Sequence, residues 1–267
     1  MLMYRPTSLA EALDALAEHP EATLLAGGTD LMVEINLTYR RPETVIALRR
    51  VPELQRWEDR FIGGGVTYER LEHSDERALA EAARTVGSPQ IRAAGTIGGN
   101  VSTASPAGDT LPFLYAAGAT VLLASKSGER RLPVAEFITG VKETDRRPDE
   151  VVVGVELPDA MPQRQAFAKV GPRQAMVIAV VNACVFRFDD GTTRLALGAV
   201  GPTIVRAEAA EAQAASLDVF AEGDFDEFQR LVSAAARPIT DHRSTAEYRS
   251  HAVGVVARRA LERCLAA

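Results

Sequence analysis

Apolar and polar positions in the first 160 residues follow short periods that predict helices and strands mixed along the chain. Ser8 and Glu11 form an S-x-x-E capping box, so a helix is expected from Leu9 to about Glu18. Residues 31–37 fit a helix and a strand equally well. The other elements predicted in this part are strands within 22–28, 43–48, 60–63, 120–125, 128–138 and 150–158, and helices over about 75–86 and 110–117.

The pattern changes after about residue 163, where strand-like runs come first and helical segments follow. Asp189-Asp190-Gly191 joins two of the runs and is a hairpin signal. Ser244 and Glu247 form a second S-x-x-E sequence, which predicts a capping box on the last helix. We therefore expect a domain boundary near residue 163, followed by a small antiparallel sheet with helices on one face. The predicted elements are strands within 165–171, 177–188 and 193–200, and helices over about 207–215, 224–236 and 246–265.

The composition is that of an ordinary globular protein, with 46% hydrophobic and 25% charged residues among 267. The formal net charge is −6 at pH 7, which argues against binding of nucleic acid or of an anionic membrane through the overall field. An anionic ligand would need backbone amides and a few placed cations instead.

The two cysteines are too few to hold an iron–sulfur cluster or a structural zinc ion. Cys184 lies in an apolar run and is interpreted as a core thiol, and Cys264 lies near the end of the last helix. The sequence lacks a signal-peptide pattern and lacks the roughly 18 consecutive apolar residues of a membrane span. We expect a cytoplasmic chain with no metal site.

Two glycine pairs raise the possibility of a phosphate-binding site. Gly27-Gly28 and Gly98-Gly99 lack a Cβ, so their backbone N–H groups could approach a pyrophosphate closely. Thr29, Thr96 and Asn100 add side-chain donors beside them. Either pair alone is more often an ordinary tight turn, and neither belongs to a dinucleotide fingerprint or a P-loop. A third glycine run, at residues 61–66, is interpreted as a turn.

Three charged residues have both a structural and a functional interpretation. Asp30 could accept a hydrogen bond from a ribose hydroxyl or cap the segment that follows it. Asp109 could be the N-cap of the helix near 110–117 or could contact a cofactor. Lys169 could be a solvated strand lysine or the cation of an anionic cofactor site, and Arg92 and Arg173 have weaker claims. No histidine, serine or cysteine arrangement indicates a catalytic residue.

With these residues considered together, the chain resembles the FAD-binding (medium) subunits of the molybdenum hydroxylases, the family of xanthine dehydrogenase and carbon monoxide dehydrogenase flavoproteins. The two glycine motifs, with an aspartate nine residues after "GGN", are the most specific part of the resemblance, which covers nearly the whole chain. The matching segments are "LLAGGTDL" (24–31), "SPQIRAAGTIGGNVSTASPAGDTLP" (88–112), "FITGVKETDRRPDEVVVGVELP" (137–158), "FAKVGPRQAMVIAVVNACV" (167–185), "RLALGAVGPTIVRAEAAE" (194–211) and "ITDHRSTAEYRSHAVGVVARRALE" (239–262).

The resemblance implies an α+β fold. A two-lobed FAD-binding domain of the vanillyl-alcohol-oxidase (PCMH) type would occupy 1–163, with lobes of about 1–55 and 56–163, and the family's C-terminal domain would occupy 164–267. Val86 stands where vertebrate xanthine oxidoreductases carry an aromatic beside the flavin, so flavin stacking there is open. The implied FAD-site residues are Leu24, Leu25, Ala26, Gly27, Gly28, Thr29, Asp30, Leu31, Thr96, Ile97, Gly98, Gly99, Asn100, Asp109, Val152 and Lys169.

The resemblance also implies a division of labour among subunits. A partner with a molybdenum cofactor would hydroxylate the substrate, and a partner with two [2Fe–2S] clusters would pass electrons to FAD in this chain. FAD would deliver them to NAD or another acceptor, in a xanthine dehydrogenase-like enzyme that is a dimer of heterotrimers. Three alternatives remain open: a self-contained FAD oxidase of the vanillyl-alcohol type, a scaffold subunit that has lost FAD, and a phosphosugar or nucleotide binder, which would explain one glycine loop but not both. The small C-terminal part disfavours the first, and the intact glycine motifs disfavour the second.

Overall fold

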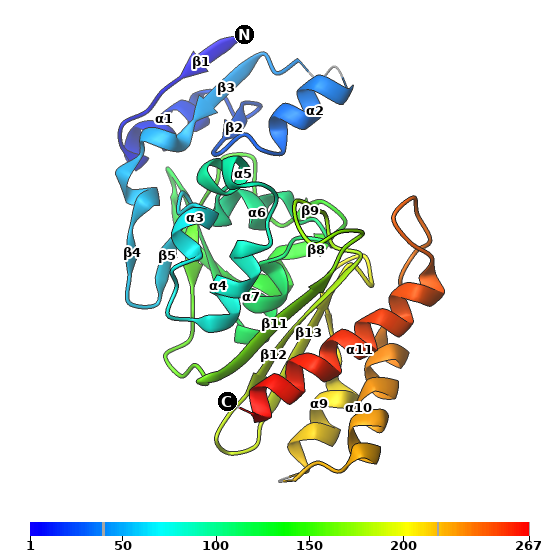
Figure 1. The fold of residues 1–267 in the computed structure, drawn as a ribbon. Coiled ribbons are helices and arrows are strands. Elements are labelled where there is room, and N and C mark those ends of the chain that lie inside the picture. The colour runs from blue at the N-terminus through cyan, green and yellow to red at the C-terminus, as the bar shows by residue number, and fades with distance from the viewer. Residues whose placement is uncertain (39–40, 218, 267) are drawn as a thin grey trace.

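The computed structural model describes residues 1–38, 41–217 and 219–266, and its three larger sheets follow one another along the chain (Figure 1). The first sheet is parallel, in the order β1-β3-β2. Helix α1 buries Ala12 and Leu16 in the same core as Ile46 of β3, as its apolar spacing requires. The elements are β1 (Leu2–Tyr4), α1 (Leu9–Glu18), β2 (Thr23–Leu25), α2 (Leu31–Thr38) and β3 (Thr44–Ala47), followed by 3₁₀ turns at Leu48–Arg50 and Pro52–Gln55.

The second sheet is antiparallel, in the order β4-β5-β10-β6-β7. Its strands alternate between two cores: Leu123 faces the helices of this part of the chain, and Leu122 faces the core of α1 and β3. The sheet thus joins the first sheet to the helices. Its elements are β4 (Trp57–Glu58), β5 (Phe61–Gly63), α3 (Tyr68–Leu71), α4 (Arg77–Arg84), α5 (Pro89–Ala94), α6 (Ile97–Thr103), α7 (Leu111–Ala117), β6 (Thr120–Ser125), β7 (Gly128–Pro133), α8 (Val134–Phe137), the pair β8 (Ile138–Gly140) and β9 (Glu143–Thr144), and β10 (Val151–Glu156).

The third sheet is antiparallel, in the order β11-β12-β13-β14. On β12, Ala183 and Val185 face the last three helices, and Cys184 and Phe186 face the core that contains α4 and α7 (Figure 1). The predicted sheet with helices on one face is therefore confirmed. Its elements are β11 (Arg164–Val170), β12 (Val181–Arg187), β13 (Thr193–Gly198), β14 (Val205–Arg206), α9 (Glu208–Ala215), α10 (Glu222–Ala235) and α11 (Ala246–Leu265).

Most of the predicted elements and the hairpin between β12 and β13 are confirmed, but both capping boxes differ from expectation. Ser8 caps α1 by accepting from the Glu11 N–H, yet the Glu11 carboxylate accepts from Thr7 and not from Ser8. The prediction of Ser244 as the cap of α11 was wrong. Thr245 caps this helix, because the backbone around Ser244 is held by the Asp241 carboxylate in a tight turn.

Three other local predictions change. Residues 31–38 are helical, although α2 buries none of its side chains. The strand expected over 128–138 ends at Pro133, and one turn of helix follows. Residues 88–103, for which no helix was predicted, form α5 and α6, with Ser88 and Thr96 as their N-caps. None of the described helices is both long and apolar enough to cross a membrane.

Candidate functional site

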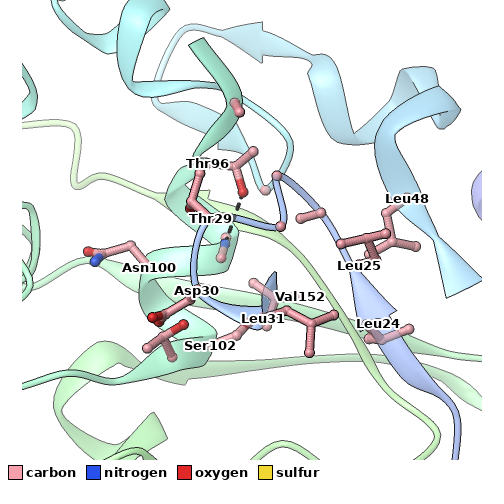
Figure 2. Close-up of a pocket in the computed structure, with 18 of the residues that line it drawn as sticks. Leu24, Leu25, Thr29, Asp30, Leu31, Leu48, Thr96, Asn100, Ser102 and Val152 are labelled. Carbon is pink, nitrogen blue, oxygen red and sulfur yellow. Dashed lines mark hydrogen bonds between the residues drawn. The ribbon is translucent and has the colours of Figure 1, made fainter. Parts of the chain in front are cut away.

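A cavity of about 1040 Å³ lies where the β2–α2 loop faces α5 and α6, and the β8–β9 turn and residues 176–178 complete its wall. The β2–α2 loop comes from the first sheet, whereas α5 and α6 belong to the second part of the chain. Apolar and polar side chains lie on opposite sides of Thr29 in Figure 2: Leu24, Leu25 and Leu48 form the first group, and Asp30, Asn100 and Ser102 form the second. The cavity thus suits a long ligand with both ring systems and charged groups.

The first glycine motif forms the β2–α2 loop and presents free donors. Within the described residues, the backbone N–H groups from Gly27 to Leu31 donate no hydrogen bond to a protein acceptor. Gly28 adopts φ +74°, a left-handed conformation that glycine takes without a steric penalty. Gly27 packs on α5, because a Cβ there would lie 1.9 Å from the Ala94 carbonyl oxygen. Donors without acceptors in a cavity wall are typical of an anion site.

The second glycine motif is not a loop but the first turn of α6. Its backbone donors already have acceptors inside the protein. Ile97 N–H donates to the Val66 carbonyl and Gly98 N–H to the Gly64 carbonyl, each at 3.0 Å. Gly99 N–H donates to Thr96 Oγ1, also at 3.0 Å. These amides are therefore already used inside the protein, and contact of Gly98 and Gly99 with a cofactor stays a prediction.

Close packing accounts for Gly98. A Cβ at Gly98 would lie 2.6 Å from the Gly64 carbonyl oxygen, and a Cβ at Gly64 would lie 2.6 Å from the Val152 carbonyl oxygen. The glycine run at 61–66, which we interpreted as a turn, does turn after β5, but it also lets α6 approach β10 and contributes Gly64 and Gly65 to the cavity wall. Gly99 is less closely packed than Gly98, since a Cβ added at Gly99 would have Thr96 Oγ1 as its nearest neighbour, at 3.1 Å.

Asn100 supplies a side-chain donor in the second motif. Its Oδ1 accepts from Thr110 Oγ1 at 2.6 Å, which fixes the orientation of the amide group. No acceptor for Nδ2 lies among the described residues, and Asn100 lines the cavity beside Gly108. The predicted donor role of Asn100 is thus compatible with the geometry.

Asp109 is held by two residues of the third sheet. Its Oδ2 lies 2.6 Å from Lys169 Nζ, and its Oδ1 accepts from Asn182 Nδ2 at 2.9 Å. Burial raises the pKa of the Asp109 carboxyl, and the ammonium of Lys169 opposes this rise. Asp109 lies ahead of α7 but makes no capping hydrogen bond there, so the N-cap interpretation is wrong.

Lys169 is not on the cavity wall. Its side chain is 6% exposed, and Nζ also donates to the carbonyls of Thr85 and Val177. Lys169 is therefore neither a solvated strand lysine nor a cation with free donors facing the cavity. It connects Asp109 to the wall segment at 176–178.

The remaining predicted site residues fall into two groups. Leu24, Leu25, Ala26, Leu31 and Val152 line the cavity, as does Val86. Ile97 is fully buried and supports the wall from behind. Of the weaker candidates, Arg92 pairs with Glu72, and Arg173 donates to the carbonyls of Ala175 and Met176.

Several wall residues were not predicted from the sequence. Tyr68 lines the cavity, and burial near Asp109 and Asp30 raises the pKa of its hydroxyl far above the usual value. Lys142 and Arg146 also face the cavity. Both lie inside the matched segment 137–158, which was a signal that could have drawn attention to them. Among the described residues, no group of three or more His, Cys, Asp or Glu side chains could hold a metal ion.

Comparison with known proteins gives consistent matches along the chain. The family described as the FAD binding domain in molybdopterin dehydrogenase matches residues 1–160, and the family described as the CO dehydrogenase flavoprotein C-terminal domain matches residues 166–264. The nicotinate dehydrogenase FAD-subunit of Eubacterium barkeri is 37% identical over 197 residues, which cover 67% of this chain and 66% of that relative. The xanthine dehydrogenase FAD-binding subunit of Escherichia coli O157:H7 is 28% identical over 99% of this chain and 96% of that relative.

A solved structure shows the same fold over the whole chain. Carbon monoxide dehydrogenase from Hydrogenophaga pseudoflava, in a form that lacks the Mo-pyranopterin moiety of the molybdenum cofactor, matches with a TM-score of 0.90 and 31% identity. The match covers 100% of this chain and 97% of that chain. The predicted α+β fold, with an FAD-binding domain before a C-terminal domain, is confirmed.

Proposed function

The chain belongs to the family of FAD-binding subunits of molybdenum hydroxylases, as an oxidoreductase component, and on this basis we propose that it is the electron-transfer subunit of such an enzyme. It receives electrons from [2Fe–2S] clusters of a partner subunit and passes them to NAD or another acceptor. A further partner with a molybdenum cofactor oxidises the substrate, in a xanthine dehydrogenase-like dimer of heterotrimers. When bound, FAD supplies the ability to accept electrons singly and to release them in pairs.

The observation that carries this proposal is the set of free backbone N–H groups from Gly27 to Leu31 in the cavity wall. A buried or half-buried donor without an acceptor costs free energy unless a ligand or water satisfies it. Several such donors in one loop, with Asn100 Nδ2 also free, match the oxygens of a pyrophosphate. The residues present therefore fit the pyrophosphate of FAD.

The chain's residues have distinct roles in this proposal. The amides of 27–31 and the Asn100 side chain hold the pyrophosphate. Val152 contacts the cofactor from the second sheet, and Asp109 accepts from its flavin part. Lys169 and Asn182 hold Asp109 in place, and the ammonium of Lys169 balances the negative charge of its carboxylate. Gly98 and Ile97 act indirectly, because they pack α6 against the sheet.

Hydrogen exchange of the chain stripped of cofactor tests the site directly. We expect the amides of 27–31 to exchange rapidly without FAD and to become protected when FAD is added. Amides 97–100 should be protected in both states, since they already have acceptors. The purified chain should also carry a flavin absorption spectrum, and the released chromophore should be FAD.

Electron transfer is tested with the partner subunits. Substrate should bleach the flavin absorption of the assembled enzyme and leave the isolated chain unchanged. Turnover of an alcohol by the isolated chain would instead support a self-contained oxidase. A chain that joins the complex but never binds FAD would support the scaffold alternative and would contradict the proposal.

A further inference from the structure

Three cationic side chains line the cavity among the described residues, and one of them already donates to backbone carbonyls. Arg146 Nη1 donates to the carbonyls of Arg147, Pro148 and Glu150, at 3.0, 3.4 and 2.7 Å. Arg49 is exposed and lies in the 3₁₀ turn at Leu48–Arg50, which follows β3. Lys142 is the third cation, and no backbone carbonyl among the described residues accepts from its Nζ.

Lys142 is held at the wall by an unusual backbone contact. It lies in the turn between β8 and β9 with φ +59°, a left-handed conformation that residues with a Cβ adopt at a cost. Its N–H donates at 3.1 Å to the carbonyl of Ala104, which ends α6 with φ +49°. Two strained residues therefore anchor the turn to the helix that begins with the second glycine motif. Such strain persists where the surrounding structure maintains it, and it is concentrated at functional sites.

The side chain of Lys142 reaches across the cavity. Its Nζ lies 3.8 Å from Oε1 of Glu34, on α2, the helix that begins where the loop of free amides ends. The two side chains are 55% and 38% exposed, and the distance is beyond that of a hydrogen bond, so this contact is easily exchanged. Asp30 and Glu34 would repel a pyrophosphate bound at the same loop unless a cation were close.

We propose that Lys142 is a phosphate-binding residue that pairs with Glu34 in the absence of FAD and moves to the pyrophosphate when FAD binds. The inference rests on the proposed function, since it takes FAD as the occupant of the cavity. A lysine suits this role because its ammonium is a mobile point charge on a flexible stem. The exchange also releases Glu34 from the β8–β9 turn, so cofactor binding changes the contact between α2 and that turn.

The test measures FAD affinity in the chain stripped of cofactor. Lys142→Met should weaken FAD binding about tenfold and should make the affinity less sensitive to salt, because one charge contact with the phosphates is lost. Lys142→Arg should restore most of the FAD affinity and most of its sensitivity to salt. Glu34→Gln should tighten binding, since it removes the competing carboxylate. The melting temperature without FAD should change little in all three variants.

Lys126→Met is the matched control, because Lys126 pairs with Asp14 at the surface and does not line the cavity. It should leave FAD affinity and salt sensitivity unchanged. If the unmodified chain binds FAD and Lys142→Met binds it equally well, the inference is wrong and the proposed function stands. A loss of FAD affinity in Lys142→Met that does not depend on salt, and that Lys142→Arg does not restore, would also overturn the inference. If the unmodified chain binds no FAD, the proposed function itself fails.

Discussion

The two glycine motifs have similar sequences, yet the structure gives them opposite properties. The loop from Gly27 to Leu31 has backbone donors with no acceptor among the described residues. In the segment from Thr96 to Asp109, the amides of the glycine motif, the Asn100 carbonyl and the Asp109 carboxylate all have protein partners. The backbone amides of the first motif are therefore available to a ligand, whereas those of the second are used to hold the framework around the cavity. A pair of glycines in a sequence therefore does not say whether the missing Cβ serves a ligand or a neighbouring backbone.

The largest effect should come from removing the cation that compensates Asp109. Lys169→Met leaves a carboxylate that is 7% exposed without its partner. Breaking a buried pair in this way costs about 3–5 kcal/mol, which we expect in the free energy of unfolding of the cofactor-free chain in urea. Lys126→Met is again the control, and it should leave stability almost unchanged because its pair is exposed. Equal stability of the two variants would show that the second region is not a framework.

The stability of Lys169→Met should depend on pH. Burial already raises the pKa of Asp109 above its value in the unfolded chain, and loss of Lys169 raises it further. As the pH falls through that raised pKa, the folded state binds a proton that the unfolded state does not yet bind. Protonation therefore stabilises the folded variant. The difference in free energy of unfolding between Lys169→Met and the unmodified chain should be largest above the raised pKa and should narrow at low pH. Urea titrations at several pH values measure this.

The next largest effect on stability should distinguish Gly98 from Gly99 in the second motif. Gly98→Ala places a Cβ 2.6 Å from the Gly64 carbonyl oxygen, so backbone must move, at a cost of about 3 kcal/mol. Gly99→Ala meets only Thr96 Oγ1 at 3.1 Å and should cost much less. Thermal unfolding without FAD measures both. Substitution of Gly98 would thus report packing and not contact with the cofactor, and two equally stable variants would contradict this account.

The structure also shows which features local sequence could predict. Helix α11 and the hairpin at Asp189-Asp190-Gly191 were predictable, because apolar spacing and turn residues act over a few positions. Helix α6 was not, since its first-turn amides donate to the carbonyls of Gly64 and Val66, which lie more than 30 residues earlier in the chain. Glycine propensity alone argues against a helix there, and tertiary contacts override it.

The candidate site shows the same limit. The matched motifs indicated site residues that mostly line the cavity, Thr29 and Asp30 among them. They did not show that Lys169 points at Asp109 and away from the cavity wall, because that pair joins residues on α7's leading loop and β11. Nor did they single out Lys142, whose position depends on a left-handed turn and on the end of α6. Partners distant in sequence decide which charges face a ligand.

The smallest effect on stability, and the closest comparison of the two motifs, comes from Thr→Val at matched positions. Thr96→Val removes the cap that accepts from Gly99 N–H and should cost about 1 kcal/mol without FAD. Thr29→Val removes a hydroxyl that has no partner among the described residues, so stability should change by less than about 0.5 kcal/mol. With FAD the order should reverse, since Thr29 lies in the loop of free donors, and its loss should weaken FAD affinity about tenfold. Unfolding in urea and FAD titration of both variants measure the two effects. If Thr29→Val destabilises the cofactor-free chain as much as Thr96→Val does, the first motif is also framework, and the distinction between the motifs fails.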